Sequence, residues 1–436
     1  MTAADPTIAT IILVVGLLVL IFLRFPITFA VIISTIACLM YLGFPAAALV
    51  QNTIRGMSSF SLMAIPFFIT MGAIIMGGTI GDKLVDLATA TVGWMRGGLA
   101  QVDVVASAIF GGISGSPTAD VASVGAVVFP IMAKAGYPPA FNGALTMSSA
   151  VQGLIIPPSH NMVIFATAAG GVSIGALFLA GYIPLMIMTT LMMSTVYIIS
   201  VIRKFPKGDK FVLRNFIKQF FISFWALAVI FIVVFGVVLG YFTATEASAI
   251  AVVYTLIISI YIYKGLKWRN VWALLDNAIN TLSIVMILIG VSAAFGFCLT
   301  FLQVPQATAE LIYAISGNNV IIVFLMINII LLLLGSIMDM AGLILISTPI
   351  LLPVAVQAGM SPITFGVMIV LNCGIGLITP PVGTTLFVTS SVSKVPVETL
   401  VKGNVPFYGC MLVALMIITY FPAVTLTLPR LFGMIA

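Results

Sequence analysis

A short stretch rich in glycine and hydroxyl residues, from Gly111 to Asp120, carries groups that bind small ions. It lies between two apolar runs that are each too short to cross a bilayer, since ten helical residues rise only about 15 Å. We therefore expect a re-entrant helical hairpin that turns here. Backbone groups unpaired at membrane depth must face protein, water or a ligand. The turn, with Ser114, Ser116 and Thr118, is a candidate site for a small cation or an acidic solute; a ligand-free tight turn is the alternative.

Two proline pairs, Pro157-Pro158 and Pro380-Pro381, supply a second set of groups that could bind ions. Proline lacks a backbone N–H and clashes with the preceding turn, so two in a row predict an unwound helix. The freed backbone carbonyls that could coordinate a cation belong to Gly153, Ile156, Gly376 and Thr379. The helix N-termini that follow, at residues 159–161 and 383–385, present positive dipole ends to an anion.

These features occur twice at one constant offset along the chain. When the sequence is aligned with itself so that Pro157 falls on Pro380, the two proline pairs coincide and no gap is needed. The same offset places Gly112 on Gly335 and Pro130 on Pro353. The matched residues are those that shape backbone, which favours a true repeat over chance apolar similarity. A membrane protein with two such halves is typical of secondary transporters.

Two acidic residues lie near membrane depth, and an intramembrane carboxylate is a functional candidate by default. Asp120 comes where the second arm of the first hairpin is expected to begin, so we predict that it caps that helix. Asp339 lies at the second turn, with Gly335, Ser336 and Gly342, among apolar residues where an unpaired charge is costly. We therefore expect Asp339, rather than Asp120, to bind a cation.

A different chemistry remains open for the only histidine. The sequence from Gly112 to Gly115 fits the GxSG pattern of rhomboid-type intramembrane serine proteases, with Ser114 as nucleophile and His160 as base. The repeat has no role in that reaction, because the counterparts of these two residues at the repeat offset are Ile337 and Gly383. A single histidine excludes an HExxH zinc site, and no P-loop sequence is present. Transport therefore remains the leading hypothesis, and we do not expect an enzyme.

The composition indicates that the elements that position these residues lie in a membrane. The chain has 436 residues, of which 62% are hydrophobic and 6% charged, whereas about a quarter of residues in soluble proteins are charged. The four cysteines show no CxxC pair, so no disulfide or metal role is expected. We attribute the net charge of +6 to membrane topology and not to nucleic-acid binding.

We predict an all-α polytopic fold of two inverted repeats, at 1–202 and 218–436, joined by a basic cytoplasmic linker at 203–217. Each repeat has a re-entrant hairpin, at 101–133 and 320–357, and a proline-broken span, at 139–169 and 361–393. Scaffold spans are expected within 8–43 and 218–263. Further spans are expected near 59–80, 173–201, 279–302 and 404–425, with charged amphipathic surface helices at 82–96 and 264–276.

The positive charges predict the orientation. With the N-terminus outside, all of the 17 Lys and Arg except Arg55 and Arg430 fall on the cytoplasmic side, Arg24 among them. The same orientation opens one hairpin to the cytoplasm and the other to the exterior, so the halves are expected to be inverted.

Four motifs in order, FGGISGSPTAD, GLIIPPSHNMVIFA, LLLLGSIMDMAGLILISTPILLP and GIGLITPPVG, resemble the large membrane subunit of tripartite ATP-independent periplasmic (TRAP) transporters over essentially the whole chain. The resemblance implies an elevator-type transporter, sodium coupling, and location in the bacterial inner membrane. It also implies a periplasmic binding protein that delivers an organic acid, such as a sialic acid or a C4-dicarboxylate, and a small four-helix membrane subunit. Because the first span begins at Ile8, that subunit is expected to be a separate chain.

Together, the residues and the resemblance define two sets of candidate ligands. The sodium ligands are expected among Gly112, Ser114, Ser116, Gly153, Ile156, Pro158, Gly335, Asp339, Gly376, Thr379 and Pro381. The substrate ligands are expected among Ser116, Thr118, Ser159, His160, Asn161, Gly383, Thr384 and Thr385. A stand-alone sodium–carboxylate symporter of similar architecture is the alternative within transport. In either case the hairpins and broken spans, which hold every candidate ligand, are expected to move against the scaffold.

Overall fold

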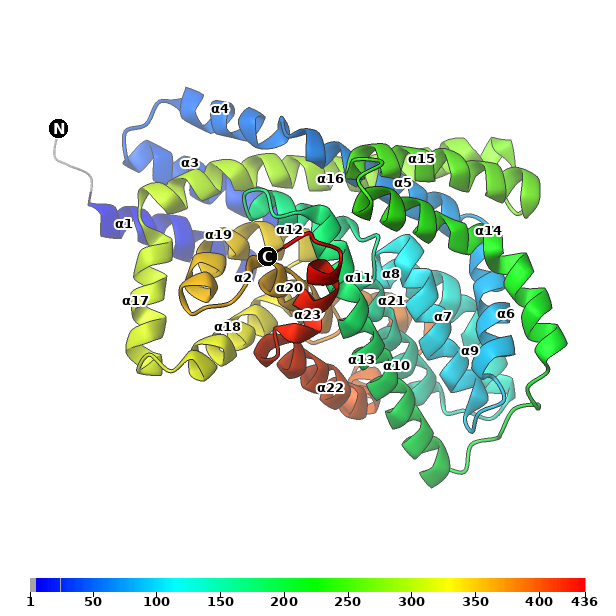
Figure 1. Cartoon of the computed structure of the whole chain (residues 1–436). Helices are drawn as coiled ribbons and strands as arrows, with labels where there is room; N and C mark the ends of the chain where they lie inside the picture. Colours follow the sequence, from blue (N-terminus) through cyan, green and yellow to red (C-terminus); the bar gives the residue numbers. More distant parts are fainter. Residues whose placement is uncertain (1–4, 24, 436) are drawn as a thin grey trace.

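The computed structural model describes residues 5–23 and 25–435, and over these residues the chain is helical apart from loops and an isolated bridge between Arg96 and Lys207 (Figure 1). Six helices are long and apolar enough to cross a membrane, or seven if one bent pair counts as a span. The predicted all-α polytopic fold is confirmed. Arg24, one of the charges used to predict orientation, lies outside the described residues.

The first half contains two helical arms of a hairpin, a broken helix and the shorter helices around them. Its elements are α1 Pro6–Thr10, η1 Ile11–Val15, α2 Gly16–Phe22, α3 Ile27–Tyr41, α4 Ala46–Met57, η2 Phe60–Met63, α5 Ala64–Met76, α6 Ile80–Val92, α7 Gly98–Ser114, α8 Pro117–Asp120, η3 Val121–Gly125, α9 Ala126–Lys134, α10 Pro139–Ala150, α11 Gln152–Ile155, α12 His160–Ala168 and α13 Ile174–Ile202. The first hairpin thus consists of α7 and the run α8–η3–α9, and the broken helix of α10–α11 and α12.

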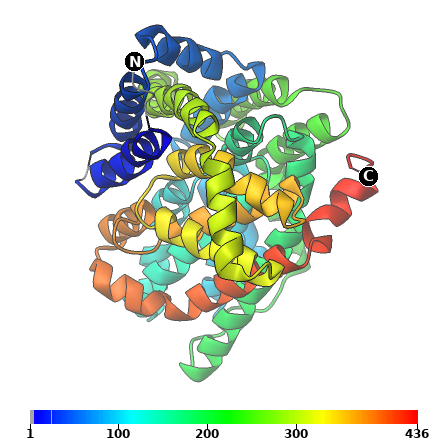
Figure 2. The same ribbon diagram turned by 90° about the vertical axis from the view of Figure 1, so that its left-hand side faces the viewer.

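The second half also contains a hairpin and a broken helix. It comprises α14 Leu213–Val238, α15 Ala244–Ile257, η4 Ile258–Ile262, α16 Trp268–Phe301, α17 Val304–Ser316, α18 Val320–Gly335, α19 Met340–Gln357, α20 Pro362–Leu377, α21 Thr384–Ser393, α22 Val397–Tyr420 and α23 Ala423–Leu431. The second hairpin is α18–α19, and the second broken helix is α20 and α21. Figure 2 looks onto α17, which packs against both arms of this hairpin.

The helix starts follow the offset found in the sequence. The long arms of the broken helices begin at Pro139 and Pro362, which are counterparts at the repeat offset, and the short arms begin at His160 and Thr384. Proline suits the first helical position because its missing N–H has no intrahelical acceptor there. The breaks predicted at Pro157-Pro158 and Pro380-Pro381 are therefore present, and the peptide bond within each of these two pairs is cis.

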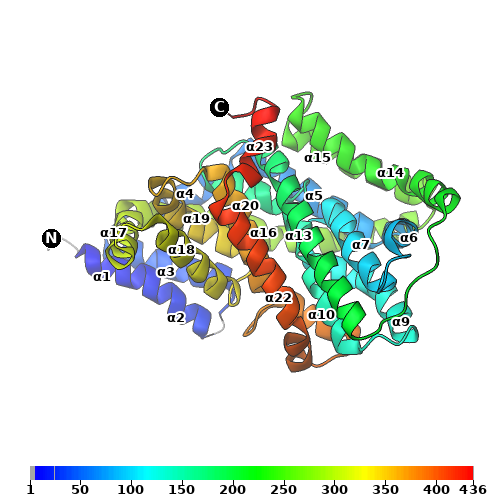
Figure 3. The ribbon, with the colours of Figure 1, turned by 60° about the horizontal axis from the view of Figure 1, so that its bottom comes forward.

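Burial separates central helices from peripheral ones. Nearly every residue of α10 and α20 is buried, as expected of helices enclosed by others. On α14, in contrast, large side chains such as Phe221, Phe231 and Phe235 are exposed. In Figure 3, α13 and α22 run side by side along the middle of the molecule, and the two helices are in contact.

The prediction of a separate surface helix at 264–276 is wrong. After a short loop, α16 runs without a break from Trp268 to Phe301, so the charged segment and the span predicted at 279–302 are one helix of 34 residues. The equivalent segment of the first half is broken, because α4 and the η2–α5 helix meet at 64°. Pro66, in the first turn of α5, fits the difference, because a proline favours a helix start and is disfavoured in a helix interior. Its counterpart in α16 is Ile289.

The segment predicted as a surface helix at 82–96 forms α6, but its apolar face is buried against α7 and α14. The helix that follows α16, α17, is the counterpart of α6 at the repeat offset and was not predicted. It begins with Val304 and Pro305 after Gln303, whose φ is +54°. In each half, therefore, the amphipathic helix precedes the hairpin directly.

Candidate functional site

The first hairpin turns at Gly115, which has a left-handed φ of +63°. Ser116 caps the returning helix by accepting a hydrogen bond from the backbone N–H of Ala119 at 3.4 Å, and its hydroxyl lies 2.9 Å from that of Thr118. Asn161, from the first turn of α12, donates to the carbonyl of Gly115 at 3.3 Å. The tip and the start of the broken helix's short arm are thus joined directly.

Three glycines of the hairpin let it approach the break closely. A Cβ on Gly111 would lie 2.1 Å from the Cα of Gly153, so the backbones of α7 and α11 touch. One residue further on, a Cβ on Gly112 would lie 2.9 Å from Ile156. A Cβ on Gly115 would lie 3.1 Å from His160 Nδ1. Glycine is required because any side chain would separate the helices.

This contact brings the candidate residues of the first half into one cluster. Its members are Gly112, Ser114, Ser116, Thr118, Gly153, Ile156, Pro158, Ser159, His160 and Asn161. Ser159 is fully buried, and within the described residues its hydroxyl has no hydrogen-bond partner. The first cluster therefore offers several oxygen atoms in a small volume.

The second hairpin meets its break in the same way. A Cβ on Gly376 would lie 2.6 Å from the Cα of Gly335. The carbonyl of Ser336 accepts hydrogen bonds from the backbone N–H groups of Val382 and Gly383, at 3.0 and 3.4 Å. A Cβ on Gly383 would lie 2.9 Å from the carbonyl oxygen of Thr379, so carbonyl groups converge at this turn.

The remaining candidates of the second half lie around this turn but differ in exposure. Pro381 is exposed, Thr384 is half-buried and Thr385 is fully buried. The hydroxyl of Thr385 lacks a hydrogen-bond partner in the part of the chain that the structure describes. Of these three side chains, Thr385 is the one with an unused polar atom inside the protein.

The capping role predicted for Asp120 is wrong, and Asp339 has a capping role that was not predicted. Asp120 does not cap a helix: Ser116 occupies that position, and both carboxylate oxygens of Asp120 are buried without a partner among the described residues. Asp339 is instead the cap of α19, where it accepts a hydrogen bond from the N–H of Ala341 at 3.3 Å, and its side chain is exposed. Because a carboxylate has several acceptor positions, Asp339 can cap α19 and still accept further contacts.

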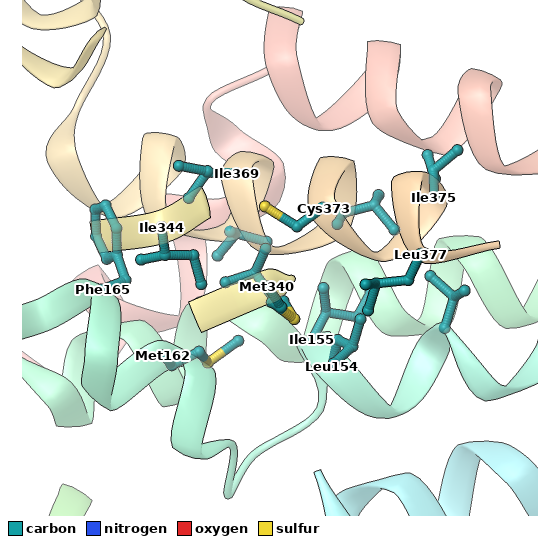
Figure 4. Packing of buried hydrophobic residues seen from close by; sticks show 14 of the residues in the cluster. Leu154, Ile155, Met162, Phe165, Met340, Ile344, Ile369, Cys373, Ile375 and Leu377 are labelled. Carbon is teal, nitrogen blue, oxygen red and sulfur yellow. The ribbon is translucent and has the colours of Figure 1, made fainter. Parts of the chain in front are cut away.

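The short arm of each broken helix packs against the hairpin of the other half. The helix after the first break, α12, packs against α19 of the second hairpin, and the helix after the second break, α21, packs against α8 and η3 of the first. The broken helices also touch each other, since a Cβ on Gly374 would lie 2.6 Å from Leu154. Figure 4 shows the apolar layer between the halves, where Leu154, Met162 and Phe165 face Met340 and residues of α20.

Comparisons with known proteins fit this arrangement. The family model described as "Tripartite ATP-independent periplasmic transporter, DctM component" matches residues 14–424. The chain belongs to this family. It is 37% identical over 375 residues to the C4-dicarboxylate TRAP transporter large permease protein DctM of Pseudomonas aeruginosa, covering 86% of this chain and 87% of the relative. It is 34% identical over 420 residues to the sialic acid TRAP transporter large permease protein SiaM of Vibrio cholerae, covering 96% and 97%.

Among solved structures, the YdaH transporter of Alcanivorax borkumensis has a similar fold. The TM-score is 0.60 at 12% sequence identity, and the match covers 85% of this chain and 86% of that one. The predicted resemblance to TRAP large subunits is confirmed by the sequence comparisons, and YdaH supports the fold alone.

Membership of the TRAP family makes the chain a transporter subunit and not an enzyme. Ser114 Oγ, the nucleophile of the protease hypothesis, accepts a hydrogen bond from the N–H of Ser116 at 3.5 Å.

Sequence analysis did not identify the buried polar residues behind the tips. In the second half, Asn372 of α20 donates to Asn328 Oδ1 of α18 at 2.7 Å, and Asn328 Nδ2 donates to Thr419 Oγ1 of α22 at 3.1 Å. In the first half, Asp103 of α7 accepts from Thr146 of α10 at 2.7 Å. Asn328 lies 44 residues from Asn372, and Asp103 lies 43 residues from Thr146, so local sequence patterns cannot reveal either pair.

Proposed function

We propose that the chain is the large, substrate-moving subunit of a sodium-coupled TRAP transporter that imports an organic acid across the bacterial inner membrane. The observation that carries the proposal is the pair of clusters in which a hairpin tip meets an unwound break at a glycine–glycine contact, Gly111 with Gly153 and Gly335 with Gly376. Sites built from discontinuous helices are characteristic of secondary transporters.

Sodium fits the oxygen atoms at the breaks. The carbonyls of Gly153 and Leu154 would bond to the N–H groups four residues on, but those residues are Pro157 and Pro158, which have none. Hard cations prefer several oxygen ligands, and carbonyls freed in this way cost little to present. We propose the sodium ligands predicted from the sequence, with Asp339 supplying a carboxylate oxygen that its cap leaves free.

A carboxylate substrate fits the positive ends of the short arms. Helices α12 and α21 begin at the breaks, and their N-termini favour an anion. The residues proposed to hold the substrate at these N-termini and at the first tip are Ser116, Thr118, Ser159, His160, Asn161, Gly383, Thr384 and Thr385. The TRAP relatives described above are named for C4-dicarboxylates and sialic acid, both of which carry carboxylate groups.

The proposed cycle is an elevator movement. The hairpins and broken helices, which hold every proposed ligand, move as a unit against scaffold helices within 8–43 and 218–263. The halves are inverted, with the N-terminus in the periplasm, so an exchange of conformations between halves carries the site across the bilayer. A periplasmic binding protein delivers the solute, and a separate small four-helix membrane subunit completes the complex.

The test is uptake into proteoliposomes that contain the chain with its small subunit and solute-loaded binding protein. The solute is first identified by thermal-shift screening of the binding protein against organic acids. Uptake is expected with an inward sodium gradient and is expected to vanish when potassium replaces sodium. Equal uptake in both salts would refute sodium coupling. Uptake of free solute without the binding protein would instead favour the stand-alone symporter.

A further inference from the structure

Four polar side chains form a buried group inside the first hairpin, separate from the residues of the tip. They are Asp103 and Ser107 of α7, Asp120 of α8 and Thr146 of α10, and each is 0% exposed. Charged side chains in a protein interior are costly unless they are paired or bind an ion. This group therefore needs an explanation that the tip sites do not provide.

The four side chains are neighbours. Asp103 and Ser107 are four residues apart and so share one face of α7. Thr146 Oγ1 lies 2.7 Å from Asp103 Oδ2. On the other arm of the hairpin, Asp120 of α8 faces Ser107, and α7 and α8 pack against each other. Asp103 and Asp120 thus lie on the two arms of one hairpin, with Ser107 between them and Thr146 beside Asp103.

These four side chains hold more acceptor atoms than hydrogens. Asp103 Oδ1, both carboxylate oxygens of Asp120 and Ser107 Oγ have no hydrogen-bond partner among the described residues. Thr146 has one hydroxyl hydrogen but two acceptors, Asp103 Oδ2 at 2.7 Å and the carbonyl of Asn142 at 3.1 Å. The side chains alone cannot satisfy this set of oxygens.

The helices packed around α7 supply no buried positive charge. Helix α10 has no charged residue, and neither do α5, α11 and η3; α13 contributes only the phenols Tyr182 and Tyr197. Lys83 is half-buried on α6 and lies 3.9 Å from Asp86. Arg96 is half-buried in the loop before α7 and forms no ion pair among the described residues. The other charged residues on contacting helices, all exposed, are Asp82, Lys134, Arg214 and Lys218. No side chain of these helices therefore neutralises the two carboxylates.

The second half shows that a hairpin of this type does not require such a group. The counterparts of Asp103, Ser107, Asp120 and Thr146 at the repeat offset are Met326, Ile330, Leu343 and Ile369. All four are apolar, although α18, α19 and α20 form the same hairpin and broken helix. Packing alone would be served better by apolar residues in the first half too.

We propose that Asp103 and Asp120 share a bound monovalent cation, a proton or a sodium ion, inside the first hairpin. A proton would supply the missing hydrogen between these oxygens. A sodium ion would be held by the carboxylate oxygens and Ser107 Oγ, which are ligands that a hard cation prefers. The site is distinct from the tip sites and does not depend on sodium coupling at the tips.

The test uses infrared spectroscopy and thermal unfolding of the full chain in lipid nanodiscs, with sodium or choline chloride and at mildly acidic or alkaline pH. If the cation is a proton, wild type shows a carbonyl band of protonated carboxylic acid that Asp103→Asn and Asp120→Asn each reduce or abolish. If the cation is sodium, sodium shifts the carboxylate bands and raises the unfolding temperature, and both variants lose part of each response. The matched control is Asp86→Asn, an exposed acid on α6, which should behave as wild type in both arms.

The proposal is overturned if folded Asp103→Asn and Asp120→Asn proteins keep the wild-type acid band and sodium response. If either variant does not fold, Thr146→Val provides the second measurement, because it keeps both carboxylates and removes one hydrogen-bond donor. Thr146→Val should shift the acid band or weaken the sodium response, and an unchanged spectrum and response would overturn the proposal. None of these readouts involves transport, so their failure is distinguishable from failure of the proposed function.

Discussion

Replacing Gly111 by alanine should disrupt the first cluster without adding charge or changing polarity. The new Cβ would lie 2.1 Å from the Cα of Gly153, whereas ordinary contact begins at 3.4 Å. If only this contact adjusts, the backbones of α7 and α11 must move apart until the distance from the new Cβ to the Cα of Gly153 rises from 2.1 Å to 3.4 Å. Overpacking of this kind costs about 1–3 kcal/mol, and about 1.4 kcal/mol corresponds to a factor of ten in an equilibrium.

We therefore expect Gly111→Ala to weaken sodium-dependent uptake by roughly 5- to 150-fold, since the assembled cluster becomes that much rarer. The assay is initial-rate uptake in proteoliposomes at matched protein density, with unfolding temperature measured in parallel. The matched control is Gly296→Ala, another helical glycine, whose Cβ would meet nothing within 4 Å. It should be neutral or slightly stabilising because alanine favours helix. Equal uptake by the two variants would refute the glycine–glycine contact as a requirement.

Three further predictions concern the second half and the motion. Asp339→Asn should raise the sodium concentration for half-maximal uptake; an unchanged sodium dependence would remove Asp339 from the sodium site. Asn372→Leu removes the donor to Asn328 Oδ1, and the unpaired buried oxygen should cost about 1–3 kcal/mol of stability. The unfolding temperature should therefore fall, and an unchanged unfolding temperature would show that the network is dispensable. A disulfide between engineered cysteines, one in span 26–43 and one in the first hairpin, close together in one state only, should block uptake until it is reduced. Full transport with the crosslink formed would rule out the elevator.

Glycine and proline made the hairpins and breaks predictable. Their effects act through the local backbone, so Pro157-Pro158 predicts a break wherever the helix is packed, and α12 does begin at His160. The capping residue of the first hairpin was readable on the same grounds, since Ser116 precedes Pro117 and serine before a first-turn proline is a strong helix-start signal. The weight given to the charge of Asp120 led to the wrong cap.

Features that depend on tertiary contacts were not predictable. The 34-residue α16 was divided in the prediction because Arg269 and Asp276 mark its start as polar. The sequence in fact contains no proline from Trp268 to Phe301 and no glycine before Gly290, so nothing local ends the helix. Asp103 was overlooked for a different reason: its partners Thr146 and Asp120 come from other segments, and their proximity arises only when α7 packs on α10.

The packing of each short arm on the hairpin of the other half has a consequence for biosynthesis. Helix η3 begins at Val121, but its partner α21 begins only at Thr384, and at about 5–20 residues per second the ribosome needs roughly 13 to 50 s to make the chain between them. During this interval the polar tip of the first hairpin lacks the helix that covers it. A nascent chain that stalls before α21 thus leaves uncovered the surface of α8 and η3 on which α21 packs.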